Sequence, residues 1–346
     1  MKILGIETSC DDTCAAIVED GEKILSNIVS SQVDIFKNYG GVIPEVAARS
    51  HLESILPVIH RSLKDAALTI TDIDAISVTH TPGLLGSLLI GTLTARTFAI
   101  INHKPFYPVH HLKSHIYANW LESDNKPTFP LLALVISGGH TQIIYMKKHN
   151  HFEIIGTTLD DAVGECFDKV AKILGLEYPG GPAISKAALS GDRKKYPLPH
   201  PKTENPYDFS FSGLKTAVLR SVQKSVNKPI SFPSHELKTL LSSKQISDFS
   251  ASFENTAIDY LLEKLARAKE NYEINSLVFA GGVSANNFLR EKARKKFPNE
   301  NIFFPALKLS GDNGAMVASA CFYEIQSGIT KSDPYSLELL PRSAIS

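Results

Sequence analysis

The sequence predicts an α/β protein built as two lobes, and two observations support this fold class. The chain has 346 residues, more than the size at which a single hydrophobic core usually keeps growing. In addition, two segments about 130 residues apart share one pattern of strand, tight polar turn, strand and strand, followed by helical sequence. A period of this length is too long for a solenoid repeat.

The two units contain the same elements in the same order. In the first unit the turn is Glu7–Thr13, and we expect strands at residues 2–6, 14–18 and 23–28. In the second unit the turn is Ser137–Thr141, and we expect strands at residues 131–136, 142–146 and 152–155. A third glycine turn, residues 281–287, follows an apolar run, and Ser284 is expected to be the N-cap of the next helix.

Composition excludes several classes of protein. Thirty-six basic and thirty-six acidic residues cancel, so any contact with nucleic acid must come from a local basic face. The four cysteines are scattered and never spaced as Cys-x-x-Cys, which argues against disulfides and zinc knuckles. The longest apolar stretch, Leu84–Ile101, is interrupted by polar residues and is interpreted as a buried amphipathic helix. Without a signal or transit segment at its start, the chain is expected to be cytoplasmic, away from membranes.

Two histidines, His111 and His115, form the first candidate metal motif. If this segment is helical, residues four apart share one face, so both imidazoles can reach one metal ion. A zinc protease of the His-Glu-x-x-His type would need a Glu as general base at the position that Leu112 occupies. Twelve histidines make chance pairs common, and His110 offers a competing spacing of five. The spacing therefore permits metal binding and disfavours a peptidase.

Further polar turns supply the other candidate site residues. Asp312 precedes an apolar helix, and it is either a helix-capping acid or the carboxylate of a two-His, one-carboxylate metal site. The glycine turns at 5–13, 137–141 and 281–287 allow backbone N–H groups to approach an anion, which favours a nucleotide held between the lobes. Glu165 and Asp168 lie three apart on a predicted helix, where a solvated face or a salt bridge is the simpler interpretation.

Basic residues form two clusters whose role the sequence leaves open. One is the run at 193–195, and the other is spread over the predicted helix at 290–296. Most such runs are solvated helix faces, and they are modest evidence for an RNA-binding surface.

The run Gly5–Thr13 resembles the opening signature of the tRNA threonylcarbamoyladenosine transferase family, formerly called O-sialoglycoprotein endopeptidase. The resemblance continues in family order along nearly the whole chain, through residues 40–49, 81–88, 135–141, 164–169, 178–182, 208–216, 280–290 and 312–313. It implies the duplicated actin-like fold of the ASKHA superfamily, with each lobe a five-stranded mixed sheet flanked by helices. The expected lobes are residues 1–128, with 318–346 packing back onto them, and residues 129–317, with the active site in the cleft between.

The resemblance also implies a reaction. The threonylcarbamoyl group of threonylcarbamoyl-AMP would pass to the N6 amine of the adenosine just 3′ of the anticodon (A37), in tRNAs reading codons that begin with A. His111, His115 and Asp312 would hold one divalent metal ion per subunit, Fe²⁺ first and Zn²⁺ second. Asp11 would be a catalytic acid. Substrate would be bound by Val135, Ile136, Ser137, Gly138, Gly139, Asp168, Gly181 and Asn286, with Glu165, Gly281 and Gly282 as further nucleotide contacts.

Implied partners are tRNA, a same-fold paralogous subunit and a small P-loop ATPase subunit of a bacterial modification complex. The alternatives are a metallopeptidase, an ATP-dependent kinase of the same fold and a non-catalytic scaffold subunit. The chain departs from the family pattern at Lys113 and Ser114, where Glu-Gly or Glu-Ala is usual, and at Gly311, where Thr is usual. Ser185 replaces an Asp of some members, and residues 227–244 match no motif of the family.

Overall fold

The computed structural model describes residues 1–336 and 341–345, and it contains the two predicted five-stranded sheets. The first sheet has the order β3-β2-β1-β4-β5 and the second the order β10-β9-β6-β7-β8. The strands of the first sheet are β1 (Lys2–Glu7), β2 (Asp12–Glu19), β3 (Lys23–Ser31), β4 (Ala75–Thr81) and β5 (Phe106–His110). Those of the second are β6 (Leu131–Ile136), β7 (Thr141–Met146), β8 (Phe152–Thr157), β9 (Ser276–Ala280) and β10 (Ile302–Phe303).

Both sheets have the same mixed topology. In the first sheet, β1, β2 and β3 pair antiparallel, whereas β4 lies parallel to β1 and β5 lies parallel to β4. The second sheet repeats this with β6, β7 and β8 antiparallel and with β9 and β10 parallel. The first hairpin closes at the pair Glu7 and Cys14, and the second closes at the pair Ile136 and Thr141. The two polar turns therefore occupy equivalent ends of the two sheets.

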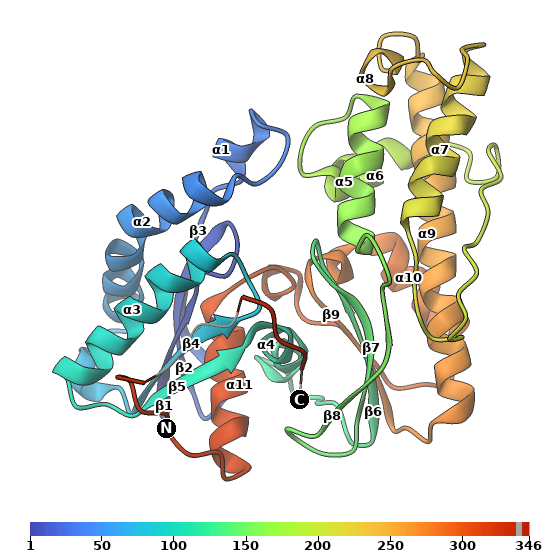
Figure 1. Cartoon of the computed structure of the whole chain (residues 1–346). Coiled ribbons are helices and arrows are strands. Elements are labelled where there is room, and N and C mark those ends of the chain that lie inside the picture. Colours follow the sequence, from blue (N-terminus) through green and yellow to red (C-terminus); the bar gives the residue numbers. More distant parts are fainter. Residues whose placement is uncertain (337–340, 346) are drawn as a thin grey trace.

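Helices cover the sheets and separate them. The helices are α1 (Val33–Lys37), α2 (Pro44–Asp65), α3 (Leu85–Ile101), α4 (His111–Tyr117), α5 (Val163–Leu174), α6 (Gly180–Ala188), α7 (Ser212–Ser225), α8 (Ser234–Leu237), α9 (Ser243–Asn271), α10 (Asn287–Lys296) and α11 (Gly314–Gln326). Short 3₁₀ turns are η1 (Ile70–Asp72), η2 (Ala118–Trp120), η3 (Gly282–Ala285) and η4 (Leu307–Leu309). Helices α2 and α3 pack on one face of the first sheet, and α4 and α11 lie between the two sheets (Figure 1).

The layer formed by α4 and α11 joins the two halves into one core. A single cluster of buried side chains includes Ile3 of the first sheet, Ala133 of the second, and Met316 and Val317 of α11. Gly5 allows β1 and α11 to approach each other closely, because a Cβ at this position would lie 2.2 Å from the carbonyl oxygen of Gly314. Of the returning segment predicted at 318–346, residues 337–340 and 346 lie outside the described residues.

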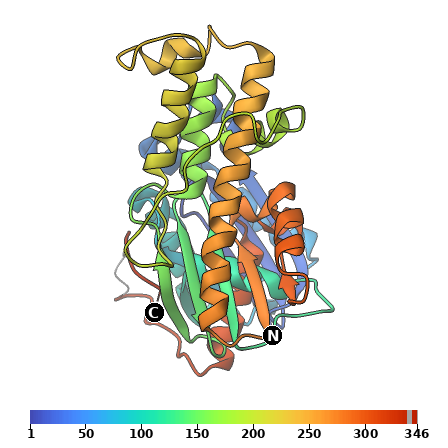
Figure 2. The ribbon, with the colours of Figure 1, turned by 90° about the vertical axis from the view of Figure 1, so that its right-hand side faces the viewer.

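Helices α5 to α9 form a second core that extends beyond the second sheet (Figure 2). Apolar side chains recur at three- and four-residue intervals between residues 249 and 268, and they are buried in α9. The segment 227–244 contains α8, whose Leu237 is fully buried against this core. The segment 227–244 is therefore anchored to the second lobe.

Helix α3 corrects one expectation. The segment Leu84–Ile101 does form a helix, but the face that it turns outward is apolar, with Leu85, Leu89 and Leu93 exposed. Its inward face buries Leu88, Ala95 and Ala99 together with the small or polar residues Ser87, Gly91 and Thr92. Throughout the part of the chain that the structure describes, we find no helix with the length and apolar character that crossing a membrane requires.

Candidate functional site

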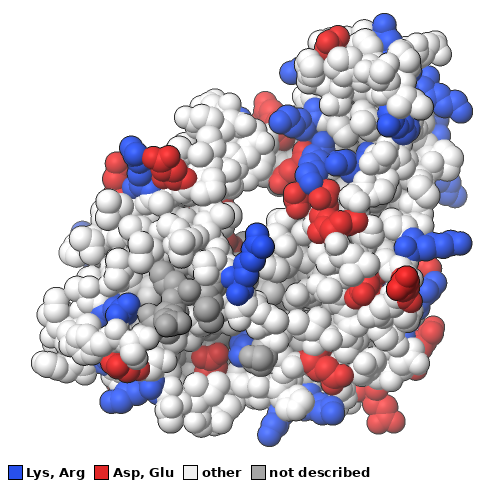
Figure 3. Space-filling model, viewed as in Figure 1, with Lys and Arg blue, Asp and Glu red and all other residues white. Residues whose placement is uncertain are grey.

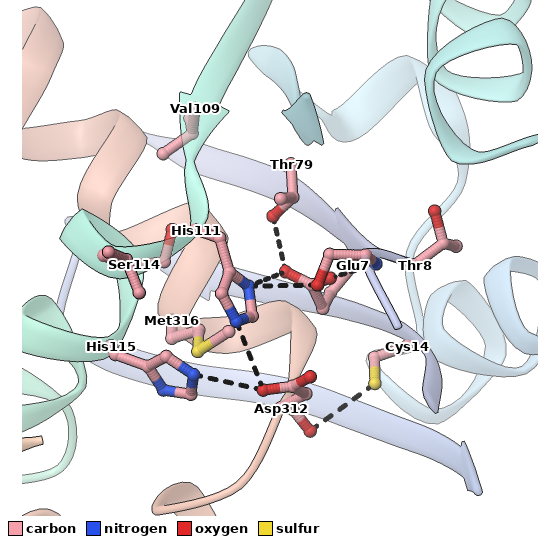
Figure 4. A network of polar contacts seen from close by, with 12 residues as sticks. Glu7, Thr8, Cys14, Thr79, Val109, His111, Ser114, His115, Asp312 and Met316 are labelled. Atoms are coloured by element: carbon pink, nitrogen blue, oxygen red, sulfur yellow. Dashed lines mark hydrogen bonds and ion pairs between the residues drawn. The ribbon is translucent and has the colours of Figure 1, made fainter. Parts of the chain in front are cut away.

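The two histidines of α4 meet the aspartate that precedes α11. Helix α4 begins at His111, immediately after β5, so one helical turn separates the two imidazoles and their ring centroids lie 4.6 Å apart. Asp312 Oδ1 lies 3.1 Å from His115 Nε2 and 3.6 Å from His111 Nε2 (Figure 4). One ligand atom from each residue lies within 4.8 Å of the others.

The structure excludes the capping interpretation of Asp312. The N-cap of α11 is Asn313, whose side-chain oxygen accepts a hydrogen bond from the N–H of Met316 at 2.9 Å. Asp312 is therefore free of a capping role and faces the histidines. Its burial would raise the pKa of its carboxyl group, but the neighbouring His111 and His115 lower that pKa to about 2.

These three residues fit a divalent metal ion. The ring of His115 is 1% exposed, and neither ring nitrogen has a hydrogen-bond partner, since its short contact with Asp312 is not aligned as a hydrogen bond. Leaving a buried polar atom unpaired costs about 1–3 kcal/mol. A metal ion held by the Nε2 atoms of both histidines and by a carboxylate oxygen would give His115 Nε2 a partner. Two imidazoles with one carboxylate would also leave coordination positions open for substrate.

Glu7, at the end of β1, orients the first histidine. Its Oε2 lies 3.0 Å from His111 Nδ1 and accepts a hydrogen bond from the Thr79 hydroxyl, while Oε1 accepts from the N–H of Ser9. A carboxylate keeps a proton on Nδ1, which leaves the Nε2 lone pair directed at the metal position. Burial would lower the pKa of His111, but Glu7 and Asp312 raise it to about 9, so a metal ion would have to displace a second proton, on Nε2. Sequence reasoning assigned Glu7 no role, although an acid closing an otherwise apolar strand was the available signal.

The first turn places Asp11 in a region of negative charge. Burial raises the pKa of Asp11, and the charge of Asp312 raises it further. The same two causes raise the pKa of Asp12 to about 7. Asp11 is therefore set to hold a proton more readily than an ordinary aspartate, as a general acid or base requires.

The second and third glycine turns come together at the end of β6. Gly281 has φ 86°, and a Cβ there would lie 2.4 Å from the carbonyl oxygen of Ile136. By contrast, a Cβ on Gly138, Gly139 or Gly282 would meet nothing within 4 Å, so these backbones border open space. Val135 and Ile136 are fully buried within β6, while Ser137 is partly exposed. Only the 137–139 end of the predicted segment is therefore accessible to a ligand.

Two predicted contacts on α5 have structural partners. Asp168 accepts a hydrogen bond from the N–H of Gly180 at 2.7 Å and so holds the start of α6, next to the open Gly181. Burial raises the pKa of Asp168, and the charge of Asp11 adds to the rise. Glu165 forms a salt bridge with Lys169 at 2.9 Å, which is the simpler interpretation considered for it.

Asn286 is held from three sides. It is the N-cap of α10, with its side-chain oxygen accepting from the N–H of Leu289, so the expectation that Ser284 caps this helix is wrong. Ser284 lies instead in the 3₁₀ turn η3. The Asn286 amide donates to Ser185 Oγ at 3.0 Å and to Glu254 Oε1 at 2.9 Å. Ser185 thus occupies a position beside the predicted substrate contact.

The departures at Lys113 and Ser114 leave the candidate metal ligands His111 and His115 in place. Lys113 lies 4.9 Å from the centre of the Phe152 ring; burial lowers its pKa, and the charge of Glu324 on α11 opposes that shift. Ser114 donates to the carbonyl oxygen of His110 at 3.3 Å. Both side chains therefore have partners other than His111 and His115.

Comparison with known proteins identifies the family. The family model described as tRNA N6-adenosine threonylcarbamoyltransferase matches residues 23–319. Curated relatives of that name include one from Symbiobacterium thermophilum, 49% identical over 94% of this chain and 92% of the relative, and one from Bacillus subtilis, 46% identical over 95% and 92%. One from Dehalococcoides mccartyi is 44% identical over 100% of this chain and 99% of the relative.

Two solved structures show the fold alone. Thermococcal HypF (T. kodakarensis) aligns with a TM-score of 0.59 at 13% identity, over 95% of this chain and 48% of HypF. The activator of the 2-hydroxyisocaproyl-CoA dehydratase from Clostridium difficile aligns with a TM-score of 0.52 at 13% identity, over 96% and 99%. The predicted duplicated actin-like fold is confirmed. With matches of this extent and identity, the chain belongs to the tRNA N6-adenosine threonylcarbamoyltransferase family, and the protein is a transferase.

Proposed function

We propose that this transferase moves the threonylcarbamoyl group from threonylcarbamoyl-AMP to the N6 amine of the adenosine just 3′ of the anticodon (A37), in tRNAs reading codons that begin with A. In this reaction the bond between N6 and the carbamoyl carbon forms, and the bond from that carbon to the phosphate oxygen breaks. AMP leaves with the electron pair, and N6 loses one proton. The convergence of His111, His115 and Asp312 carries the proposal.

One divalent metal ion per subunit is part of this proposal, with Fe²⁺ first and Zn²⁺ second. Imidazole and carboxylate ligands suit both ions. When bound, such an ion would supply a Lewis acid and a template for the threonyl carboxylate and the carbamoyl oxygen. His111, oriented by Glu7, and His115 would hold it together with Asp312.

The glycine turns would bind the nucleotide end of the donor. Gly138, Gly139, Gly181 and Gly282 border open space, and an exposed glycine backbone lets its N–H approach a phosphate closely. An exocyclic adenine amine is a poor nucleophile, so positioning must supply much of the acceleration. Asp11 would accept the amine proton. An Asp11→Ala variant with unchanged turnover would rule that role out.

Basic side chains offer a surface for tRNA on the helical part of the second lobe. Figure 3 shows Lys and Arg gathered over this part of the molecule, although the whole chain has no net charge. Lys172, Arg220, Lys224 and Lys238 are exposed there. In the clusters at 193–195 and 290–296, Arg193 pairs with Glu254 and the guanidinium of Arg290 donates to backbone carbonyl oxygens. The other basic residues of these clusters, except Lys292, are exposed. We propose that phosphates of the tRNA contact the exposed group.

A second surface suits a protein partner. Leu52 and Leu56 of α2 and Leu85, Leu89 and Leu93 of α3 are all more than 40% exposed, and the two helices pack against each other. Contiguous exposed apolar side chains of this kind mark interaction sites. We propose that the same-fold paralogous subunit docks here and that the complex, with the small P-loop ATPase subunit, works in the cytoplasm. Leu89→Asp should abolish the heterodimer in size-exclusion chromatography, and an intact heterodimer would contradict this assignment.

The rival activities have weaker support. Leu112 is buried where a metallopeptidase would need its Glu. The two solved structures compared above are 13% identical to this chain and show the fold alone, which gives no support for kinase activity. A scaffold subunit would have no need of a metal site in which Glu7 supports a ligand.

The decisive experiment supplies the purified protein with threonylcarbamoyl-AMP, unmodified tRNA and the bacterial partner subunits. The tRNA is then digested to nucleosides and examined by mass spectrometry. We expect threonylcarbamoyl-adenosine with the wild type and with the control His235→Ala, whose side chain is exposed, but not with His111→Ala. Absence of product from the wild type with every partner present would refute the proposal.

A further inference from the structure

Three successive carbonyl groups of the first turn are held by hydrogen bonds. The carbonyl oxygens of residues 9–11 accept hydrogen bonds, in order, from the N–H of Leu84 at 2.8 Å, the imidazole of His51 at 2.9 Å and the N–H of Gln32 at 3.0 Å. The turn therefore depends on contacts from three separate segments of the chain. Two of the donors are backbone groups, whereas His51 contributes a side chain.

His51 is fixed in one tautomer by its neighbours. It lies on α2 and is fully buried. Because a carbonyl oxygen can only accept, Nε2 must carry the hydrogen that reaches Cys10, and Nδ1 must accept, from the Thr13 hydroxyl at 2.8 Å. The Gln32 amide lies 3.4 Å from the same Nδ1. Burial lowers the pKa of His51, which favours this neutral form.

Asp11 lies between two backbone carbonyl groups that are held by hydrogen bonds. Its own carbonyl is held by Gln32, and the preceding carbonyl, that of Cys10, is held by His51. The Ser87 hydroxyl also reaches the Cys10 carbonyl, but at the longer distance of 3.3 Å. The orientation of the peptide that leads into Asp11 thus depends mainly on the imidazole of His51.

We infer that His51 is a positioning residue of the transferase: its Nε2–H holds the Cys10 carbonyl and thereby orients Asp11 toward the reacting amine. This inference rests on the proposed function. His51 takes no part in holding the metal ion in this proposal, because its ring contacts the first turn and not His111, His115 or Asp312. A displacement of a catalytic group by about 1 Å costs on the order of 10²-fold in rate.

Two amide substitutions at His51 separate the hydrogen bond from mere packing. Glutamine places its amide nitrogen as many bonds from Cα as imidazole Nε2, so His51→Gln can still donate to Cys10. Asparagine reaches only as far as Nδ1, so His51→Asn can bond Thr13 but not Cys10. His151→Asn is the matched control, because that histidine is exposed. For each variant we would measure kcat, KM for tRNA, bound Zn²⁺, Tm and hydrogen exchange in the peptide spanning residues 8–13.

We expect His51→Asn to lose about 10²-fold in kcat, with KM for tRNA and bound Zn²⁺ changed less than about twofold. His51→Gln should recover most of that loss although its Tm is similar, and exchange in the 8–13 peptide should rise only in His51→Asn. Equal kcat for the two variants, or a wild-type kcat in His51→Asn, would overturn the inference. If the wild type itself makes no product, the proposed function fails, and the exchange measurement still decides whether His51 holds the turn.

Discussion

Replacing Glu7 by Gln should weaken metal binding without removing a ligand. Glu7 is fully buried, and its two oxygens accept from three donors: the His111 ring, the Thr79 hydroxyl and the N–H of Ser9. A glutamine amide has one oxygen and one NH₂ group. If the NH₂ group faces Ser9, two donors oppose each other; if it faces His111 and Thr79, it competes with both of their hydrogens.

The magnitude follows from the charge as well as from the hydrogen bonds. Glu7 supplies a negative charge 3.0 Å from His111 Nδ1, and that charge makes the opposite ring nitrogen a stronger ligand. Losing a partner of this type costs about 10- to 100-fold in metal affinity, which corresponds to about 1.4–2.7 kcal/mol. Asp312→Asn, which removes a candidate ligand, should cost more than Glu7→Gln.

The assay is a competition titration of metal-free protein with Zn²⁺ and a fluorescent chelator of known affinity. Glu19→Gln is the matched control, because Glu19 lies on the neighbouring strand β2 and pairs with Lys23. We expect the control to bind Zn²⁺ like the wild type. A Glu7→Gln variant that is folded and binds Zn²⁺ as tightly as the control would refute the reasoning, and with it the role of Glu7 in orienting His111.

Two further predictions concern stability. Burial raises the pKa of Glu324 to about 7, with Lys113 opposing the shift, so the folded state binds this proton more tightly than the unfolded state and loses stability as the pH rises from about 4.5 to 7. Glu324→Gln should therefore raise the free energy of unfolding at pH 8, by up to about 3 kcal/mol, and have little effect at pH 4. Chemical denaturation of the variant and the wild type at pH 4 and at pH 8 measures the difference. A variant that is less stable than the wild type at pH 8 would contradict the prediction. Gly281→Ala should lower Tm strongly, because it combines a left-handed φ with a Cβ 2.4 Å from the Ile136 carbonyl oxygen, whereas Gly282→Ala meets nothing within 4 Å. Equal Tm values for the two alanine variants would show that the backbone at Gly281 can relax.

Local patterns predicted the first three strands of each unit and the polar turn between the first two, whereas the five-stranded mixed sheets were implied by the resemblance to the family. The apolar runs at 2–6 and 131–136 are long enough for buried strands, and the polar turns after them can only lie at sheet ends, so the two related units followed from the sequence. Helix α3 shows the limit of this reasoning. Its apolar residues were expected to be buried, but composition does not say which face of a helix a sheet will cover, and Leu85, Leu89 and Leu93 remained outside.

The candidate site also has a part that could be predicted from the sequence and a part that could not. By itself, the sequence determined that His111 and His115 share one face of a helix, because residues four apart in a helix must, and that a Glu beside the first is absent. Only the tertiary structure decided that Asp312 lies beside these histidines, that Glu7 contacts the ring of His111 and that His51 contacts the first turn. Asp312 is far along the chain from the histidines, and the packing of α11 between the two sheets brings it to them. Long-range contacts of this kind depend on how whole elements pack, which no local spacing records.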